Sequence, residues 1–222
     1  MSDRENFQKL LLDNKKEVMV LSEQVERALS RSIEALKKRD LKLGHQIIAE
    51  DAKIDQKRFE IEKKCIDLIA SRQFADADLN TIVAILSIII ELERIGDYAD
   101  GIAKIVIMIG DEPPLKPLID IPRMCEITVE MVHDSIASFI ENDSQKAVHA
   151  ISMDEVVDSI YDQIFRELLT FLMADPKTIN RATRLIWVAH NIERAADRAT
   201  NICERVVYTI TGKKSSLGGS KY

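Results

Sequence analysis

Apolar residues recur at steps of three and four along most of the chain. Over residues 7–38 they include Leu11, Val18 and Leu21, and this spacing is typical of one long helix with a single apolar stripe. The same period continues through the rest of the sequence. It predicts six long helices in an all-α protein, over residues 7–38, 43–71, 79–110, 121–140, 144–174 and 176–211.

Polar turn signals separate several of these helices. Asp40 and Asp143 each mark a turn between two periodic stretches. Asp175 is followed by Pro176, which is a start signal because proline fits the first turn of a helix. These positions predict short turns between antiparallel helices.

The strongest break is at residues 113–117, which hold three prolines. Proline ends a helix and is frequent in linkers. We therefore expect one domain over residues 1–112 and a second over 118–212. The Ser/Gly/Lys-rich tail, residues 213–222, is expected to be disordered.

The two halves of the chain repeat each other, with acidic residues among the matching positions. At an offset of 103 residues the acidic matches are Asp51 with Asp154 and Asp55 with Asp158. At an offset of 100 the matches are Glu93 with Glu193, Arg94 with Arg194, and Asp97 with Asp197. A duplicated domain explains such a long period. We expect two tandem three-helix bundles with an up-down-up course.

Each half thus carries two pairs of carboxylates spaced four residues apart. Residues at this spacing share one helix face, where like charges repel by roughly 0.2–0.5 kcal/mol. A multivalent cation would remove that repulsion, and all-oxygen ligands suit Mg, Mn, Ca or Fe. Asp100 and Asn201 would add further oxygen ligands. The alternative is a salt-bridge network in which Arg94 and Arg194 neutralise the acids.

Bulk properties narrow the class of function. The net charge of −6 argues against nucleic-acid binding, which needs a clustered basic surface. The longest apolar run, residues 82–90, is far shorter than the ~20 residues of a membrane span, and the first residues are polar. We expect a cytoplasmic protein. No motif places a nucleophile beside a base, so an enzyme is not expected.

The acidic motifs resemble those of the PhoU family, regulators of phosphate uptake and of the phosphate-starvation response. The first copy reads ERIGDYADGIA (residues 93–103) and the second ERAADRATNIC (residues 193–203). The second copy has Ala195-Ala196 where the family usually has Ile-Gly. Neither copy has the histidine often found after the aspartate. The resemblance covers residues 5–212.

The resemblance implies a ligand set for metal clusters, with iron favoured and Zn, Mn, Mg or Ca as alternatives. The clusters would be multinuclear and held by Asp51, Asp55, Glu93 and Asp97 in the first half, and by Asp154, Asp158, Glu193, Asp197 and Asn201 in the second.

The resemblance also implies a role and partners. The protein would be a non-enzymatic adaptor, and a homodimer is an expectation of the same kind. It would contact a membrane only through its partners, the ATPase subunit of a phosphate ABC transporter and a sensor histidine kinase. Two rivals are a metal-free helical scaffold and a di-iron protein of the ferritin type. The di-iron class needs two Glu-x-x-His motifs, and only Glu130 with His133 provides one.

Overall fold

Six long α-helices make up the computed structural model, which describes residues 3–71 and 74–213. They are α1 (Asp3–Lys38), α2 (Leu41–Ala70), α3 (Asp76–Ile109), α4 (Asp120–Glu141), α5 (Ser144–Ala174) and α6 (Ile179–Thr211), with a short 3-10 helix η1 (Pro176–Thr178) before α6. No strand occurs in the described ranges. The all-α prediction is confirmed, and helix ends lie within a few residues of their predicted places. Except for Lys213, the predicted tail lies outside the described residues.

The predicted turn residues cap the helices that follow them. The Asp40 carboxylate accepts a hydrogen bond from the Leu43 amide of α2 at 2.9 Å, and Asp143 caps α5 in the same way. Asp175 caps η1, so the helix expected from residue 176 begins with one 3-10 turn before α6. Gly110 ends α3 with a φ of 61°, a conformation that glycine adopts without steric cost.

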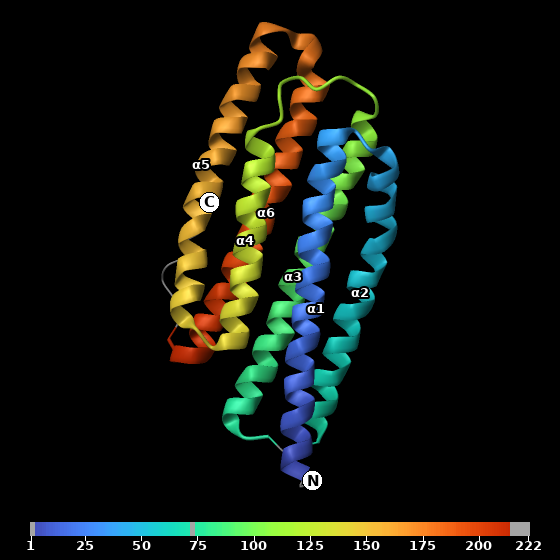
Figure 1. The fold of residues 1–222 in the computed structure, drawn as a ribbon. Coiled ribbons are helices and arrows are strands. Elements are labelled where there is room, and N and C mark those ends of the chain that lie inside the picture. Colours follow the sequence, from blue (N-terminus) through green and yellow to red (C-terminus); the bar gives the residue numbers. More distant parts are fainter. Residues whose placement is uncertain (1–2, 72–73, 214–222) are drawn as a thin grey trace.

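The helices form two three-helix bundles, α1–α3 and α4–α6, placed side by side along their length (Figure 1). Helix α3 packs on α6 and α1 packs on α4, whereas α2 and α5 lie at opposite edges. Among the described helices, α2 contacts only α1 and α3. The prediction of two tandem homologous bundles is confirmed.

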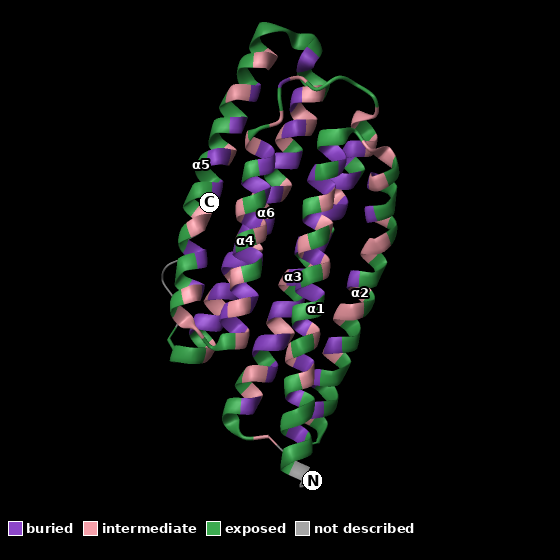
Figure 2. Ribbon diagram, in the orientation of Figure 1, coloured by how far each residue is buried: buried purple, intermediate pink, exposed green. Residues whose placement is uncertain are grey.

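The core lies where the inner faces of the helices meet, as the buried positions in Figure 2 show. Helix α3 contributes most to it: Ile85, Ile88 and Leu92 are fully buried. Full burial of such a side chain stabilises the fold by roughly 1.5–3 kcal/mol. This explains the unusually apolar sequence of α3, which packs against α1, α2 and α6. None of the described helices has an apolar stretch long enough to cross a bilayer.

The proline-containing linker is held against the second bundle. Lys116 is buried and pairs with Glu167 of α5. Arg184 of α6 pairs with Glu112 at 3.4 Å, and Arg181 donates a hydrogen bond to the Pro113 carbonyl at 3.5 Å. The linker therefore has a defined path between the bundles.

Candidate metal centre

The first acidic cluster lies between α2 and α3. Helix α2 supplies Asp51 and Asp55, and α3 supplies Glu93, Asp97 and Asp100, each pair one helical turn apart. The carboxylates of Asp55, Asp97 and Asp100 all act on Asp51 electrostatically. The structure thus brings together the five acids predicted for the first bundle. Asp100 is buried, Asp97 is exposed, and the other three are half-buried.

Gly96 lets the two helices of this cluster approach closely. A β-carbon at this position would lie 3.2 Å from the Ile54 side chain and 3.6 Å from Asp51 Oδ1. Asp51 therefore lies directly over the backbone of α3. A larger residue at position 96 would push α2, and with it Asp51, away from the acids of α3.

The environment of this cluster disfavours the charged form of three of its acids. Burial, together with the charges of Asp100, Asp55 and Asp97, raises the pKa of Asp51 to about 6. The pKa values of Glu93 and Asp97 are also raised, first by burial and then by neighbouring carboxylates. Charged carboxylates here are incompletely compensated, which is the condition under which a cation stabilises such a cluster.

Three basic side chains offset part of this negative charge. Arg58 Nε of α2 lies 3.4 Å from Glu93 Oε2, and the same guanidinium pairs with Glu62 at 2.7 Å. Lys104 pairs with Asp100. Arg94 is exposed, and its charge lowers the pKa of Glu93 and Asp97. Sequence reasoning missed Arg58, although its position three residues after Asp55 places both on one face of α2.

The second acidic cluster occupies the equivalent place between α5 and α6. Asp154 and Asp158 come from α5, and Glu193 and Asp197 from α6. Burial and the neighbouring acids raise the pKa of Asp154 to about 6 and that of Glu193 to about 7. The duplication seen in the sequence therefore places four acids together in each bundle.

The neighbours of the second cluster differ from those of the first. Arg194 Nη1 lies 3.1 Å from Asp197 Oδ2 on the same helix. His190 Nδ1 lies 3.3 Å from Glu193 Oε2. The neighbouring Thr200 side chain lowers the pKa of Asp154, against the larger effect of burial. Arg194 thus pairs with an acid of its own helix, and the neighbouring Tyr98 of α3 raises the pKa of Arg194.

Asn201, a predicted ligand of the second cluster, contacts the other bundle. Its amide nitrogen donates a hydrogen bond to Glu91 Oε2 of α3 at 3.4 Å. Arg198 Nη1 also lies 3.3 Å from that oxygen. The structure therefore places the Asn201 side chain in the interface between α3 and α6.

The chemistry of both clusters suits a hard cation, because every donor is a carboxylate oxygen. In the part of the chain that the structure describes, no three His, Cys, Asp or Glu side chains are gathered closely enough to hold one ion. The helices bring the acids near one another, and coordination of a common ion would require their side chains to rotate. The donor set fits a metal, and the side-chain positions are not coordinating ones.

Comparison with known proteins identifies the same duplicated unit. The family model described as PhoU domain matches the chain twice, over residues 18–106 and 121–206. The chain is 40% identical over 205 residues to the "Phosphate-specific transport system accessory protein PhoU homolog" of Aquifex aeolicus, covering 92% of this chain and 93% of that protein. It is 33% identical to the "Phosphate-specific transport system accessory protein PhoU" of Escherichia coli over 89% of this chain and 82% of that one.

Solved structures share the fold over almost the full length. The crystal structure of PhoU from Pseudomonas aeruginosa superposes with a TM-score of 0.89 at 31% identity, covering 93% of this chain and 100% of that chain. The phosphate transport system regulatory protein PhoU from Streptococcus pneumoniae gives 0.88 at 29% identity, covering 95% and 99%.

Proposed function

The chain belongs to the PhoU family, and on that premise we propose that it is an accessory regulator of phosphate transport that binds metal ions in its two acidic clusters. It acts without catalysis, as an adaptor that restrains phosphate uptake and phosphate-starvation signalling. Its partners are the ATPase subunit of a phosphate ABC transporter and a sensor histidine kinase. The names of its relatives support the link to phosphate transport.

The observation that carries the metal proposal is the acidic pattern that recurs at matching places in both bundles. A single pair of acids at this spacing is common on helix surfaces. Four acids from two facing helices, present twice and with raised pKa values for several members, need a compensating charge. Bound metal ions would supply the compensating positive charge, and the carboxylates of each cluster would hold them. Iron is the metal favoured by the family resemblance.

A metal-free scaffold is the second candidate, and specific contacts favour it. Arg58, Lys104 and Arg194 already pair with acids of the clusters. In that case the ion pairs themselves would be the compensation, and the protein would bind partners without metal. The two candidates predict different metal contents for the purified protein.

Elemental analysis of the purified protein tests the metal proposal. We expect bound metal in the wild type, and loss of about half of it in each of two double variants, Glu93→Ala with Asp97→Ala and Glu193→Ala with Asp197→Ala. Combining all four substitutions should remove nearly all of it, because each cluster loses the carboxylates that α3 or α6 provides.

A matched control separates a metal site from a general loss of negative charge. Glu126 and Glu130 form an exposed acid pair with the same spacing on α4, outside both clusters. Their double alanine variant should keep the wild-type metal content. Protein without metal after supplementation with Fe, Mn, Zn or Mg would rule out the metal proposal and leave the scaffold.

The adaptor role is tested separately by affinity capture. Tagged protein is incubated with solubilised membranes from phosphate-replete cells, and captured proteins are identified by mass spectrometry. We expect the transporter ATPase and a sensor histidine kinase. Their absence would contradict the proposed partners, whatever the metal content.

A further inference from the structure

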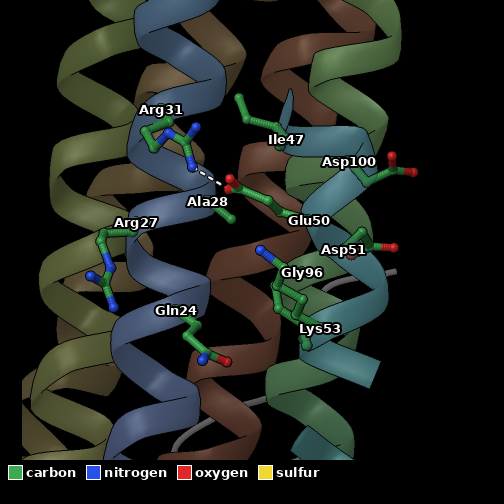
Figure 3. A pocket seen from close by; sticks show the side chains of 11 residues that line it. Gln24, Arg27, Ala28, Arg31, Ile47, Glu50, Asp51, Lys53, Gly96 and Asp100 are labelled. Atoms are coloured by element: carbon green, nitrogen blue, oxygen red, sulfur yellow. Dashed lines mark hydrogen bonds and ion pairs between the residues drawn. The ribbon is translucent and has the colours of Figure 1, made fainter. Parts of the chain in front are cut away.

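A cavity of about 300 Å³ opens between α1 and α2 in the first bundle. Its floor is formed by Ala28, Ile47 and Ile54 together with Gly96 of α3. Figure 3 shows Arg31 reaching from α1 toward Glu50, Gln24 lower on α1, and the Arg27 side chain on the side of α1 opposite to Glu50. The volume is at the lower end of the ~300–1,000 Å³ typical of small-molecule sites.

The charged groups around this cavity leave two cations without an ion pair. Arg31 pairs with Glu50 across the gap between α1 and α2 (Figure 3). Within the described residues, Arg27 and Lys53 form no ion pair. A phosphate monoester carries about −1.5 to −2 charges at pH 7, so its charge matches that of these two side chains together.

Three acids line the cavity, Glu50, Asp51 and Asp100, and Asp100 is paired with Lys104. Asp51 is therefore the carboxylate on this wall that opposes an anion, and it lies on the α3 side of the cavity, beside Gly96. An anionic group is favoured near Arg27 of α1 and Lys53 of α2, and hydrogen-bond donors are favoured beside Asp51.

A buried acceptor in the cavity lacks a donor. The Gln24 side-chain oxygen is shielded from solvent and has no hydrogen-bond partner. A buried polar atom left in this state costs about 1–3 kcal/mol. A ligand hydroxyl would satisfy it, and a second hydroxyl would suit Asp51. Inorganic phosphate would supply the negative charge and leave most of the cavity volume unfilled.

The second bundle shows that the fold itself does not need these polar residues. At the offset of 103, positions 24, 27, 31 and 53 correspond to Ile127, Glu130, Asp134 and Val156. The same three-helix bundle thus forms with an apolar or acidic residue at each of them. The basic and amide lining is a property of the first bundle.

We propose that this cavity binds a small phosphorylated molecule that carries hydroxyl groups, of the sugar-phosphate class. Lys53 contacts the phosphate together with Arg27, whose exposed side chain rotates toward the cavity. Gln24 accepts a hydrogen bond from a hydroxyl. The cavity shares Asp51 and Asp100 with the first acidic cluster. Its anion-binding groups lie outside that cluster, so the proposal does not rest on metal binding.

Isothermal titration calorimetry tests this site, with ribose 5-phosphate and glucose 6-phosphate as probes. Ribose and inorganic phosphate serve as the two separate halves of the ligand. We expect at least one sugar phosphate to bind with a Kd below about 1 mM, and at least tenfold more tightly than either half. The combined variant Arg27→Gln with Lys53→Gln should weaken that binding at least tenfold, because it removes both charged donors.

Two further variants show whether the cavity is the site. Gln24→Ile introduces the residue of the second bundle and should weaken binding about two- to tenfold. Lys63→Gln with Arg123→Gln removes the same charge from exposed positions outside the cavity, and binding should be unchanged. All variants should keep the helical circular-dichroism spectrum, since the substituted cations are exposed and Gln24→Ile introduces the residue that the second bundle already accommodates at the equivalent position.

Three results would overturn the proposal. The first is that neither sugar phosphate binds below about 1 mM. The second is that inorganic phosphate or ribose binds as tightly as the sugar phosphates. The third is that the variant pair at Arg27 and Lys53 has no more effect than the control pair.

Discussion

Glu93 and Glu193 occupy the same position in the two bundles but differ in their environment. Burial raises the pKa of both, yet only that of Glu193 reaches about 7. Glu93 lies 3.4 Å from the permanent cation of Arg58. At the offset of 103, Arg58 corresponds to Tyr161, which is neutral, so Glu193 lacks this counter-charge.

The remaining neighbours of the two glutamates also differ between the two bundles. His190 lies beside Glu193, and its counterpart in the first bundle is Ile90. Asp100 corresponds to Thr200, a neutral residue beside Asp154. The first cluster has more acids together with a fixed cation, and the second has fewer acids and a histidine neighbour. Duplication preserved the acidic positions and changed how their charge is balanced.

Neutralising each glutamate is the change expected to have the largest effect. The raised pKa of Glu193 means that its charged form destabilises the folded metal-free protein, and this loss of stability develops as pH rises from about 4.5 to about 7. Glu193→Gln should therefore raise the free energy of unfolding by about 2–3 kcal/mol at pH 8, at ~1.4 kcal/mol per pH unit of pKa change, and by less than about 1 kcal/mol at pH 5. Urea denaturation at both pH values measures it.

The comparison predicts a smaller gain for Glu93→Gln. That substitution also relieves repulsion from Asp55 and Asp97, but it removes the ion pair with Arg58. An equal or larger gain for Glu93→Gln would contradict the role assigned to Arg58. A loss of stability in both variants would instead favour the metal-free scaffold.

Introducing into the second bundle the cation that the first bundle has beside its glutamate should have an intermediate effect, seen in the pKa of Glu193. Tyr161→Arg places a cation where the first bundle has Arg58, and should lower the pKa of Glu193 from about 7 by about one pH unit or more. The pH titration of the Glu193 carboxyl carbon by NMR measures this shift. Tyr161→Gln, which removes the ring without adding charge, is the control. If both variants give the same pKa, Arg58 is not the cause of the difference between the bundles.

The smallest effect is expected at His190. Its ring is about half exposed, at 55% of its reference area, and lies 3.3 Å from Glu193. His190→Gln should change the free energy of unfolding at pH 6 by less than about 1 kcal/mol, because exposed ion pairs contribute little. A larger change in thermal or urea unfolding would mean that His190, and not the missing arginine, dominates the second cluster.

The sequence predicted the helices and the acidic clusters because both depend on local spacing. Apolar steps of three and four identify a helix, and the same geometry puts Asp51 and Asp55, or Glu93 and Asp97, on one face. The repeat then indicated that both bundles carry the pattern. The pairing of α2 with α3 followed from short turns between antiparallel helices.

Contacts between residues on different helices could not be predicted from spacing along one helix. Asn201 has the spacing of a ligand, four residues after Asp197, but its amide nitrogen contacts Glu91 in the other bundle. The partner of Glu93 proved to be Arg58, 35 positions earlier in the chain, and not the adjacent Arg94. Neither contact follows from the spacing along one helix, since each depends on how two helices are aligned.

The sequence by itself determined the number of helices, the duplication and the two sets of acids, because helical periodicity and caps are local properties. Only the tertiary structure decided which charges meet: Arg58 with Glu93, His190 with Glu193, and Asn201 with Glu91. It also decided that Gln24 and Arg27 line a cavity. The physical reason is that side-chain packing sets the axial alignment of neighbouring helices, and a shift of one turn would exchange every polar contact between them.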